Sequence, residues 1–391
     1  MGRHTRGVAT VVAVAAIFAV SGCGLSFDID PMTGSLGVAE TVGPTVSPAP
    51  TPSADPSERP YDASDPTTWT DRQLVAQTIF QCVPVSNIGA ASRAVRKGLG
   101  GVVFLGGVAP NNLAQQITKL VDRAGDRVPP FIASDEEGGV VQRLADVIYP
   151  LRSAKTMGTW PDSDVTRTAS KYGTAMKKLG VDMALSPVAD LDIAGHFIGG
   201  QFRAFSSTPS GAARSVIAWA TGLESVGVAP VIKHWPGHGR ATDTHWNPGI
   251  IPAYSQLKKS DLVPFDRAIA AGFTAVMVGH LESKGLTERG VPASRSPKAL
   301  AILRTQIGPD GLIITDSLSM EAALVGVKHR SGEAVRASLD AGADVALICS
   351  GPSNIVERVV AQISPAGLTR DELIDKVKRI LAWKKRFGVI D

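Results

Sequence analysis

Residues 231–245 read VIKHWPGHGRATDTH. The apolar run at residues 228–232 stops abruptly at Lys233 and His234. The eleven residues that follow His234 hold two more histidines, an aspartate, a proline and two glycines. Proline and glycine at this density disfavour a helix. The stretch therefore predicts a buried strand that ends in a loop of specific shape, with side chains that can do chemistry.

From about residue 70 onward, short apolar runs alternate with longer segments that suit helices. We count eight short apolar runs, at residues 79–85, 101–105, 130–133, 181–188, 228–232, 274–278, 312–315 and 345–349. Longer segments that suit helices lie at residues 110–123, 163–178, 209–225, 260–270, 297–306, 332–341 and 369–387. Alternating strands and helices indicate an α/β fold with a parallel sheet, and continuous apolar strands indicate burial on both faces.

Eight such units in roughly 320 residues predict a (β/α)8 TIM-type barrel that forms a single catalytic domain. A doubly wound open sheet is the competing interpretation. The absence of a Gly-x-Gly-x-x-Gly pattern after the first run weakens it.

Polar residues follow the apolar runs, at the strand ends where a barrel places its active site. After the third to the eighth run these residues are Ser134 to Gly139, Asp190 and Asp192, Lys233 and His234, His280, Asp316 and Ser317, and Ser350. Most of the residues that precede the runs are Gly, Ala and Val. This difference between the two ends of the predicted strands indicates an enzyme.

Four candidate residues, at three places in the sequence, have two interpretations each. Asp316 is either a nucleophile or charge stabiliser at a strand mouth, or the N-cap of a following helix. Asp135 and Arg143 either bind vicinal hydroxyl groups or belong to a capped helix start. Arg203, flanked by Phe202 and Phe205, either binds a polar ligand or anchors its loop through an ion pair.

The histidine-rich loop offers a dyad. In Asp243-Thr244-His245 the carboxylate can fix the tautomer of the imidazole and favour its protonated form. A zinc site is disfavoured, because Pro236 and Gly237 break the helix on which histidines four residues apart would share a metal.

The N-terminus has the composition of an export signal. Arg3 and Arg6 precede an apolar stretch at residues 8–20, which is short for a membrane span of about 20 residues. Val20-Ser21-Gly22-Cys23 resembles a bacterial lipoprotein box. We therefore expect residues 1–22 to be a lipoprotein-type signal peptide and Cys23 to carry the lipid; an ordinary secretory signal or an uncleaved anchor is the alternative.

Residues 23–68 are rich in Pro, Ser and Thr, which predicts a disordered tether. Residues 69–391 would then form the catalytic domain. The expected location is the outer face of the cell membrane, with the protein held there by its lipid anchor.

The net charge indicates which classes of partner to expect, and the cysteine content indicates whether a disulfide can form. The formal net charge is +4, and subtracting Arg3 and Arg6 leaves +2. The sequence shows no basic cluster, so we expect no nucleic-acid partner. Apart from Cys23, the chain has Cys82 and Cys349, in the first and eighth predicted strands. Strand register decides whether they form a disulfide, and the sequence leaves this open.

Five ordered motifs carry a resemblance to a known family. They are Lys233 to Gly239 followed by Asp243 to His245, Asp135 to Arg143, Pro187 to Asp190, Arg203 to Phe205, and Thr315 to Met320. Together they resemble glycoside hydrolase family 3, in its β-N-acetylglucosaminidase branch, from about residue 70 onward. The departures are small: Trp235 replaces a usual Phe, and Ala204 a usual Ser.

The resemblance implies a retaining mechanism. Asp316 would be the nucleophile, and His245, held by Asp243, would donate and retrieve the proton. It further implies that sugar is bound by Asp135, Arg143, Arg203, Lys233 and His234, with Asp190 supporting them from behind. No metal or cofactor is implied, and we expect a monomer.

The expected substrate follows from the same resemblance. Many family 3 β-glucosidases take their acid from a second domain, whereas this sequence ends at Asp391 after its last predicted helix. We therefore expect the barrel loop to supply the acid and N-acetylglucosamine to be preferred over glucose, as in peptidoglycan fragments. A family 3 β-glucosidase, an N-acetylglucosaminide phosphorylase and a non-catalytic sugar-binding lipoprotein are the rival interpretations, and the sequence does not fix the aglycone or the physiological role.

Overall fold

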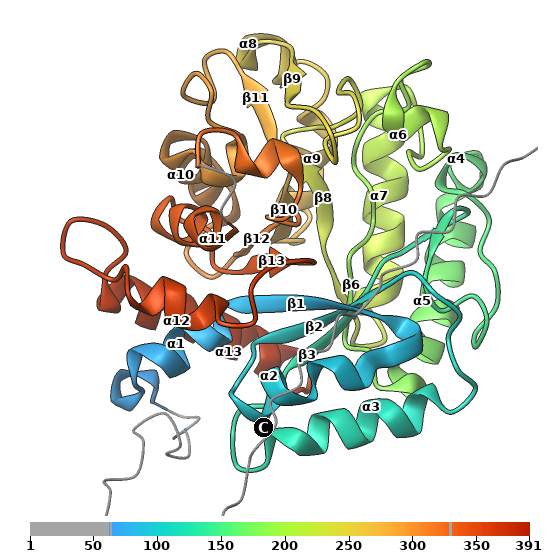
Figure 1. Cartoon of the computed structure of the whole chain (residues 1–391). Helices are drawn as coiled ribbons and strands as arrows, with labels where there is room; N and C mark the ends of the chain where they lie inside the picture. Colours follow the sequence, from blue (N-terminus) through green and yellow to red (C-terminus); the bar gives the residue numbers. More distant parts are fainter. Residues whose placement is uncertain (1–61, 63–64, 328–330) are drawn as a thin grey trace, which may run out of the picture. The chain divides into compact units, whose positions relative to one another are not determined.

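The computed structural model describes residue 62, residues 65–327 and residues 331–391 (Figure 1). The predicted signal peptide at residues 1–22, the predicted lipidation site Cys23 and most of the predicted tether lie outside the described residues. At the end of that tether, Pro66–Thr68 form a 3₁₀ turn (η2) whose first turn is capped by the side chain of Asp65.

Each predicted apolar run contains a strand. The strands are β1 (Ile79–Pro84), β2 (Gly101–Leu105), β3 (Phe131–Ser134), β6 (Met183–Ala184), β7 (Ala229–Pro230), β8 (Ile232–Trp235), β10 (Ala275–Val278), β12 (Leu312–Thr315) and β13 (Ala346–Ile348). Val231 alone separates β7 from β8, so these two derive from one run. The prediction of an α/β fold with parallel strands is confirmed.

The strands form two parallel sheets. One has the order β13-β1-β2-β3-β6-β7, and the other has the order β12-β10-β8. Isolated parallel bridges pair Val188 with Lys233, and Ile314 with Val345. The first bridge joins the segment after β6 to β8, and the second joins β12 to the residue just before β13.

Two apolar layers bury the two faces of these strands. One cluster takes a side chain from all eight runs: Phe80, Val103, Phe131, Met183, Ala229, Ala275, Leu312 and Leu347. The alternate positions, such as Ile79, Val102 and Ile132, belong to a second cluster shared with the helices. Because successive side chains of a strand point to opposite faces, this division explains the continuous apolar runs.

Helices lie outside the strands (Figure 1). They are α1 (Asp71–Gln77), α2 (Ser92–Arg96), α3 (Leu113–Val121), α4 (Ala154–Met157), α5 (Asp162–Leu179), α6 (Phe197–Gly200), α7 (Pro209–Glu224), α8 (Tyr254–Leu257), α9 (Val263–Ala270), α10 (Pro297–Ile307), α11 (Ser331–Asp340), α12 (Ile355–Val360) and α13 (Arg370–Arg386). Their starts follow local signals. Thr208 and Ser296 cap α7 and α10, and Thr369 forms a capping box with Glu372 at α13.

Short elements lie in the segments that connect the strands and helices. They are the 3₁₀ helices η3 (Val85–Ala91), η4 (Asp122–Ala124), η5 (Ala293–Arg295) and η6 (Glu321–Leu324), and the strands β4 (Glu136–Gly138), β5 (Val141–Gln142), β9 (Gly249–Ile251) and β11 (Leu281–Ser283). β4 pairs with β5 in an antiparallel hairpin, and β9 pairs with β11 in parallel. The histidine-rich loop contains no helix in the described structure, as its Pro and Gly content predicted.

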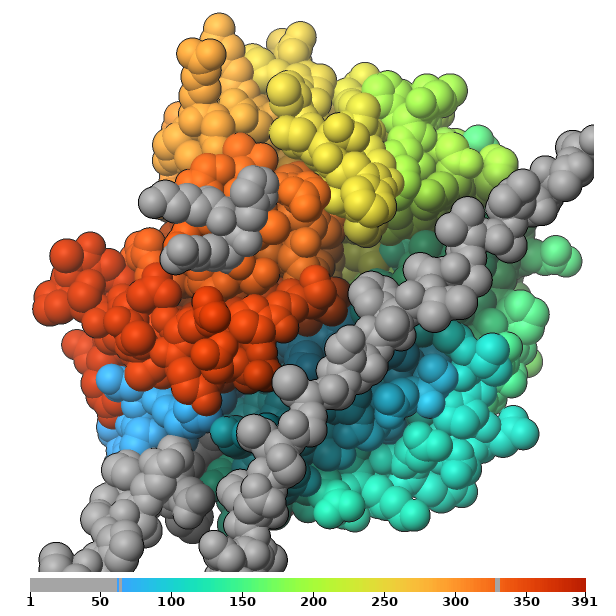
Figure 2. Space-filling view, in the orientation of Figure 1, coloured from blue at the N-terminus to red at the C-terminus, as the bar shows by residue number. Residues whose placement is uncertain are grey.

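The first described α-helix lies beside α12 and the start of α13. In Figure 2 the segment near residue 70 adjoins the segment that contains α12. Arg72 of α1 pairs with Glu357 of α12 at 2.7 Å, and Arg370 of α13 pairs with Asp71. These contacts fix the first helix against the last two.

A disulfide joins Cys82 to Cys349. The register of β1 and β13 pairs Gln81 with Ile348, so the next residues along each segment, the two cysteines, face each other. Their Cα atoms are 4.5 Å apart. The register that the sequence left open therefore permits the bridge.

Candidate active site

A cavity of about 310 Å³ opens where the parallel strands end. Its apolar lining includes Val103, Leu185, Met277 and Leu347, which belong to the strands or follow them directly. Seven of the predicted site residues also line it: Asp135, Arg143, Arg203, Lys233, His234, His245 and Asp316. Asp190 and Asp243 stand behind the lining and contact His234 and His245. Polar residues that follow different strands in the sequence thus line or support one cavity.

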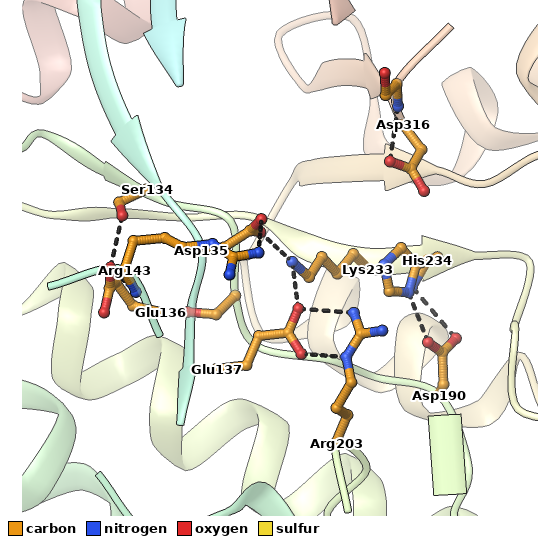
Figure 3. Close-up of polar contacts among 12 residues, drawn as sticks. Ser134, Asp135, Glu136, Glu137, Arg143, Asp190, Arg203, Lys233, His234 and Asp316 are labelled. Carbon is orange, nitrogen blue, oxygen red and sulfur yellow. Dashed lines mark hydrogen bonds and ion pairs between the residues drawn. The ribbon is translucent and has the colours of Figure 1, made fainter. Parts of the chain in front are cut away.

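Lys233 lies between two carboxylates of the loop that follows β3 (Figure 3). Its Nζ is 2.6 Å from Oδ1 of Asp135 and 2.6 Å from Oε1 of Glu137. Burial disfavours the charged amine, but Asp135 and Glu137 raise the pKa of Lys233 above its ordinary value. Lys233 therefore remains an ammonium group inside the site.

Arg203 makes a bidentate ion pair with Glu137. Its Nε and one terminal nitrogen donate to the two carboxylate oxygens at 2.6 and 2.9 Å. Burial opposes the ionisation of Glu137, but the charges of Arg203 and Lys233 hold its pKa well below its ordinary value. The loop-anchoring interpretation of Arg203 is therefore seen in the structure, while its side chain also lines the cavity.

Glu137 is a site residue that we did not predict from the sequence. Its position inside the Asp135-to-Arg143 motif was the available signal. Its partners Arg203 and Lys233 lie 66 and 96 positions further along the chain, which local composition does not reveal. Arg143 lies 3.6 Å from Asp135, so both ends of this motif meet at the cavity.

Asp190 holds the strand-end His234 in place. Its carboxylate lies 2.7 Å from Nδ1 of His234 and accepts the backbone N–H of the same residue at 3.3 Å. Burial would raise the pKa of Asp190, but His234 and His238 lower it. The carboxylate is therefore ionised and fixes the orientation of the imidazole.

Asp316 directly follows β12, at the mouth of the strand. Its backbone N–H donates to Val278, and its Oδ1 accepts the N–H of Ser317 at 2.7 Å. Burial alone would raise the pKa of Asp316, but His234, His280 and the Ser317 N–H lower it to about 2. In the described structure no helix begins at Ser317, so the helix-cap interpretation does not apply.

His280 supports the segment after Asp316. Its Nε2 lies 2.8 Å from the carbonyl oxygen of Ser317, and its Nδ1 lies 2.8 Å from the hydroxyl of Ser294. Because the ring is buried, the pKa of His280 is lowered. The sequence placed His280 at a strand end without giving it a role.

His245 is the most exposed member of the site, with 56% of its side-chain surface accessible. Its Nδ1 lies 2.7 Å from Oδ1 of Asp243, which also accepts the backbone N–H of His245 at 3.0 Å. When the carboxylate accepts a hydrogen bond from the N–H at Nδ1, Nε2 is the ring nitrogen that can exchange a proton with a ligand. The predicted dyad is therefore formed in the structure.

Among residues 65–327 and 331–391 we find no group of three His, Cys, Asp or Glu side chains placed to hold a metal ion. The helices in the same part of the chain are too short or too polar to cross a membrane.

The chain matches the glycosyl hydrolase family 3 N-terminal domain over residues 80–383. It belongs to this family. The resemblance drawn from its five motifs is thereby confirmed, and the protein is a glycosyl hydrolase.

Two curated relatives share one activity name. The beta-hexosaminidase of Stenotrophomonas maltophilia strain K279a is 34% identical over 285 residues, which cover 69% of this chain and 82% of the relative. Beta-hexosaminidase LpqI of Mycobacterium tuberculosis is 34% identical over 296 residues, which cover 73% of this chain and 74% of the relative.

Solved structures show the same relationship. The structure of M. tuberculosis LpqI is 31% identical, with a TM-score of 0.73 over 83% of this chain and 96% of that one. A family 3 β-N-acetylglucosaminidase from Paenibacillus sp. FPU-7 is 27% identical, with a TM-score of 0.75 over 82% of this chain and 63% of that one.

Proposed function

We propose that this protein is a retaining exo-β-N-acetylglucosaminidase that releases N-acetylglucosamine from cell-wall fragments. One observation carries the proposal: Asp316 and the Asp243-held His245 line a single cavity. Two carboxylates of the described residues line that cavity, and Asp135 is already paired with Lys233 and Arg143. This leaves Asp316 as the nucleophile and His245 as the proton donor. The beta-hexosaminidase relatives support the same activity.

We further propose that the two sheets form one closed (β/α)8 barrel. The bridge between Ile314 and Val345 links β12 to the segment entering β13, and β7 continues into β8. The apolar cluster with members from all eight runs is what the interior of such a barrel requires. Closure would bring the residues that follow β3, β8 and β12 to one rim.

The first chemical step is glycosyl transfer to the enzyme. A carboxylate oxygen of Asp316 attacks the anomeric carbon, and the bond from that carbon to the leaving oxygen breaks. The leaving oxygen takes a proton from Nε2 of His245, and Asp243 stabilises the imidazolium before this transfer. The low pKa of Asp316 keeps its carboxylate ionised for this attack.

The second step is hydrolysis of the glycosyl-enzyme. Water attacks the anomeric carbon, its proton passes to Nε2 of His245, and the bond to Asp316 breaks. Two inversions at the same carbon return the β configuration. The bond that Asp316 forms in the first step is thus the bond that water breaks.

The binding residues fit a sugar rich in hydroxyl groups. Lys233 and Arg203 are charged donors whose positions are fixed by Glu137, and Asp135 is a charged acceptor. Charged donors and acceptors form stronger hydrogen bonds to hydroxyl and amide groups than neutral ones do. We propose that these three residues, with Arg143 and His234, hold the N-acetylglucosamine ring.

For the rest of the chain we propose a lipoprotein arrangement. Residues 1–22 would be the signal peptide, Cys23 the lipidated residue and residues 23–68 the tether of a monomeric domain at residues 69–391. This arrangement would hold the enzyme at the outer face of the membrane, close to peptidoglycan fragments that contain N-acetylglucosamine.

Product analysis tests the proposed function. The purified protein is incubated with the disaccharide of N-acetylglucosamine and N-acetylmuramic acid, and with the 4-nitrophenyl β-glycosides of N-acetylglucosamine and glucose, each with and without phosphate. We expect free N-acetylglucosamine from the first two, independent of phosphate, and little glucose from the third. A sugar 1-phosphate would indicate a phosphorylase, and absence of turnover on every substrate would contradict the proposal.

A further inference from the structure

The imidazole of His238 links the two parts of the site. Its Nε2 lies 3.0 Å from the hydroxyl oxygen of Thr244, and its backbone N–H donates to Asp190 at 2.6 Å. Asp190 also holds the ring of His234 at 2.7 Å. A chain of hydrogen bonds therefore runs from His234, in the cavity wall, to Thr244, which lies between Asp243 and His245.

This link is buried although the catalytic dyad beside it is not. His238 is 3% exposed and Thr244 is 2% exposed, whereas the side chain of His245 is 56% exposed. A hydrogen bond between buried groups escapes competition from water and fixes geometry more firmly than an exposed one. The buried hydrogen bond between His238 and Thr244 therefore anchors the segment that carries the exposed side chain of His245.

The other hydrogen bonds that anchor residues 244 and 245 to the chain outside residues 243–245 are longer than the one between His238 and Thr244. The N–H of Glu321 donates to the carbonyl of His245 at 3.3 Å, and that of Ala322 donates to the carbonyl of Thr244 at 3.4 Å. Both exceed the usual length of an N–H···O hydrogen bond. Among the described hydrogen bonds, the one from His238 is thus the shortest that ties residues 244–245 to the chain outside residues 243–245.

In the described part of the chain, the ring of His238 makes a single hydrogen bond, to Thr244. Burial and the nearby His234 lower the pKa of His238 to about 4, so the ring is neutral near pH 7. Its Nδ1 has no hydrogen-bond partner in the described part of the chain, which leaves Thr244 as the partner of the ring. Phe197 packs against both His238 and His245, with ring centroids 6.0 and 6.2 Å away.

We propose that His238 is a positioning residue, which holds His245 in place for proton transfer by binding the hydroxyl of Thr244. The inference rests on the proposed function, because it concerns the proton donor of that reaction. Loss of the link would displace His245 and leave Asp316 untouched. It would therefore slow cleavage only where the leaving oxygen needs a proton.

Two pairs of variants separate this role from general packing. Thr244→Val removes the hydroxyl, and Thr244→Ser keeps it. His238→Gln places an amide near the position of Nε2, and His238→Asn places one near Nδ1, out of reach of Thr244. The measurement is kcat/KM on the N,N′-diacetyl disaccharide of β-1,4-linked N-acetylglucosamine and on 2,4-dinitrophenyl β-N-acetylglucosaminide, whose leaving group needs no proton.

We expect Thr244→Val and His238→Asn to lose about fivefold to tenfold on the disaccharide and less than about twofold on the dinitrophenyl glycoside. Thr244→Ser and His238→Gln should retain most of both activities. The double variant Thr244→Val/His238→Asn should be no slower than its slower single variant, because both changes break one hydrogen bond.

Equal losses on the two substrates would show a merely structural role and overturn the inference. Unchanged activity of Thr244→Val on the disaccharide would overturn it as well, whether or not the His238 variants fold. Both results leave the proposed function standing, provided that the wild-type protein hydrolyses the disaccharide. A wild-type protein inactive on both substrates would overturn the proposed function, and this inference with it.

Discussion

Cys82 and Cys349 lie 267 positions apart in the sequence, yet they form a disulfide in the wall of the cavity that also holds Asp316. The bridge joins the first strand segment to the last. A cross-link between distant positions restricts the unfolded chain strongly, and loss of a native disulfide commonly costs about 2–5 kcal/mol.

We therefore expect Cys349→Ser to lower the midpoint of thermal unfolding under non-reducing conditions. Cys82→Ser should lower it equally, and the double variant should be no less stable than either, since each change removes the same bond. Calorimetry measures the three variants. Thiol titration of denatured, unreduced protein with Cys23 replaced by Ser provides the control, and two free thiols there would contradict the bridge.

Replacing His245 with Ala should separate the substrates by their leaving groups. The proton donor typically contributes about 10²–10⁴-fold when the leaving oxygen is basic. We expect kcat/KM on the disaccharide of N-acetylglucosamine to fall by a factor in that range, and kcat/KM on the dinitrophenyl glycoside to fall far less. Equal losses on both would refute the role of His245 as proton donor.

Replacing Asp316 with Asn should abolish turnover regardless of leaving group. The amide cannot form the glycosyl-ester bond, so we expect losses of at least about 10³-fold on both substrates. A 5-fluoro N-acetylglucosaminyl fluoride should label the wild-type enzyme, and peptide mass spectrometry should locate the sugar on Asp316. A label on Asp135, the other carboxylate of the cavity lining, would show that the nucleophile is misidentified.

The sequence predicted the strands well because their signal is local. A strand buried on both faces must be largely apolar, and the eight runs are, with polar exceptions such as Gln81, Asp182 and Ser186. The short strands β4, β5, β9 and β11 escaped notice, because two or three residues give no periodicity. They form from loop segments whose pairing depends on the surrounding fold.

Candidate site residues at strand ends could be located for the same reason, whereas their partners could not. The ion pair of Arg203 with Glu137 and the bond of Cys82 with Cys349 join distant segments. Register and loop path decide such contacts. The two interpretations of Arg203 stayed open until the structure placed Glu137 beside it.

A buried carboxyl group outside the cavity lining makes a further test. Glu136 accepts hydrogen bonds from the hydroxyls of Ser134 and Tyr172, each at 2.6 Å, and from the N–H of Arg143 at 3.2 Å. Burial nevertheless raises the pKa of Glu136 to about 7. These three donors offset only part of the cost of burying the charge.

The sign of the pH dependence follows from proton counting. Between the ordinary pKa of a glutamate, near 4.5, and the folded value of about 7, folded Glu136 keeps a proton that the unfolded chain has lost. The folded state binds more protons, so stability must fall as pH rises through this window. The shift corresponds to roughly 3 kcal/mol.

The neutral isostere Glu136→Gln removes this titration. The difference in unfolding free energy between Glu136→Gln and the wild-type protein should therefore grow in favour of the variant from pH 4 to pH 8. Urea unfolding at a series of pH values measures it, and Glu357→Gln is the control at an exposed carboxylate whose pKa is lowered, not raised. If the wild-type and Glu136→Gln curves ran parallel across this window, the pKa of Glu136 would be the same in the folded and the unfolded protein. Its three hydrogen bonds would then fully offset the cost of burying its charge.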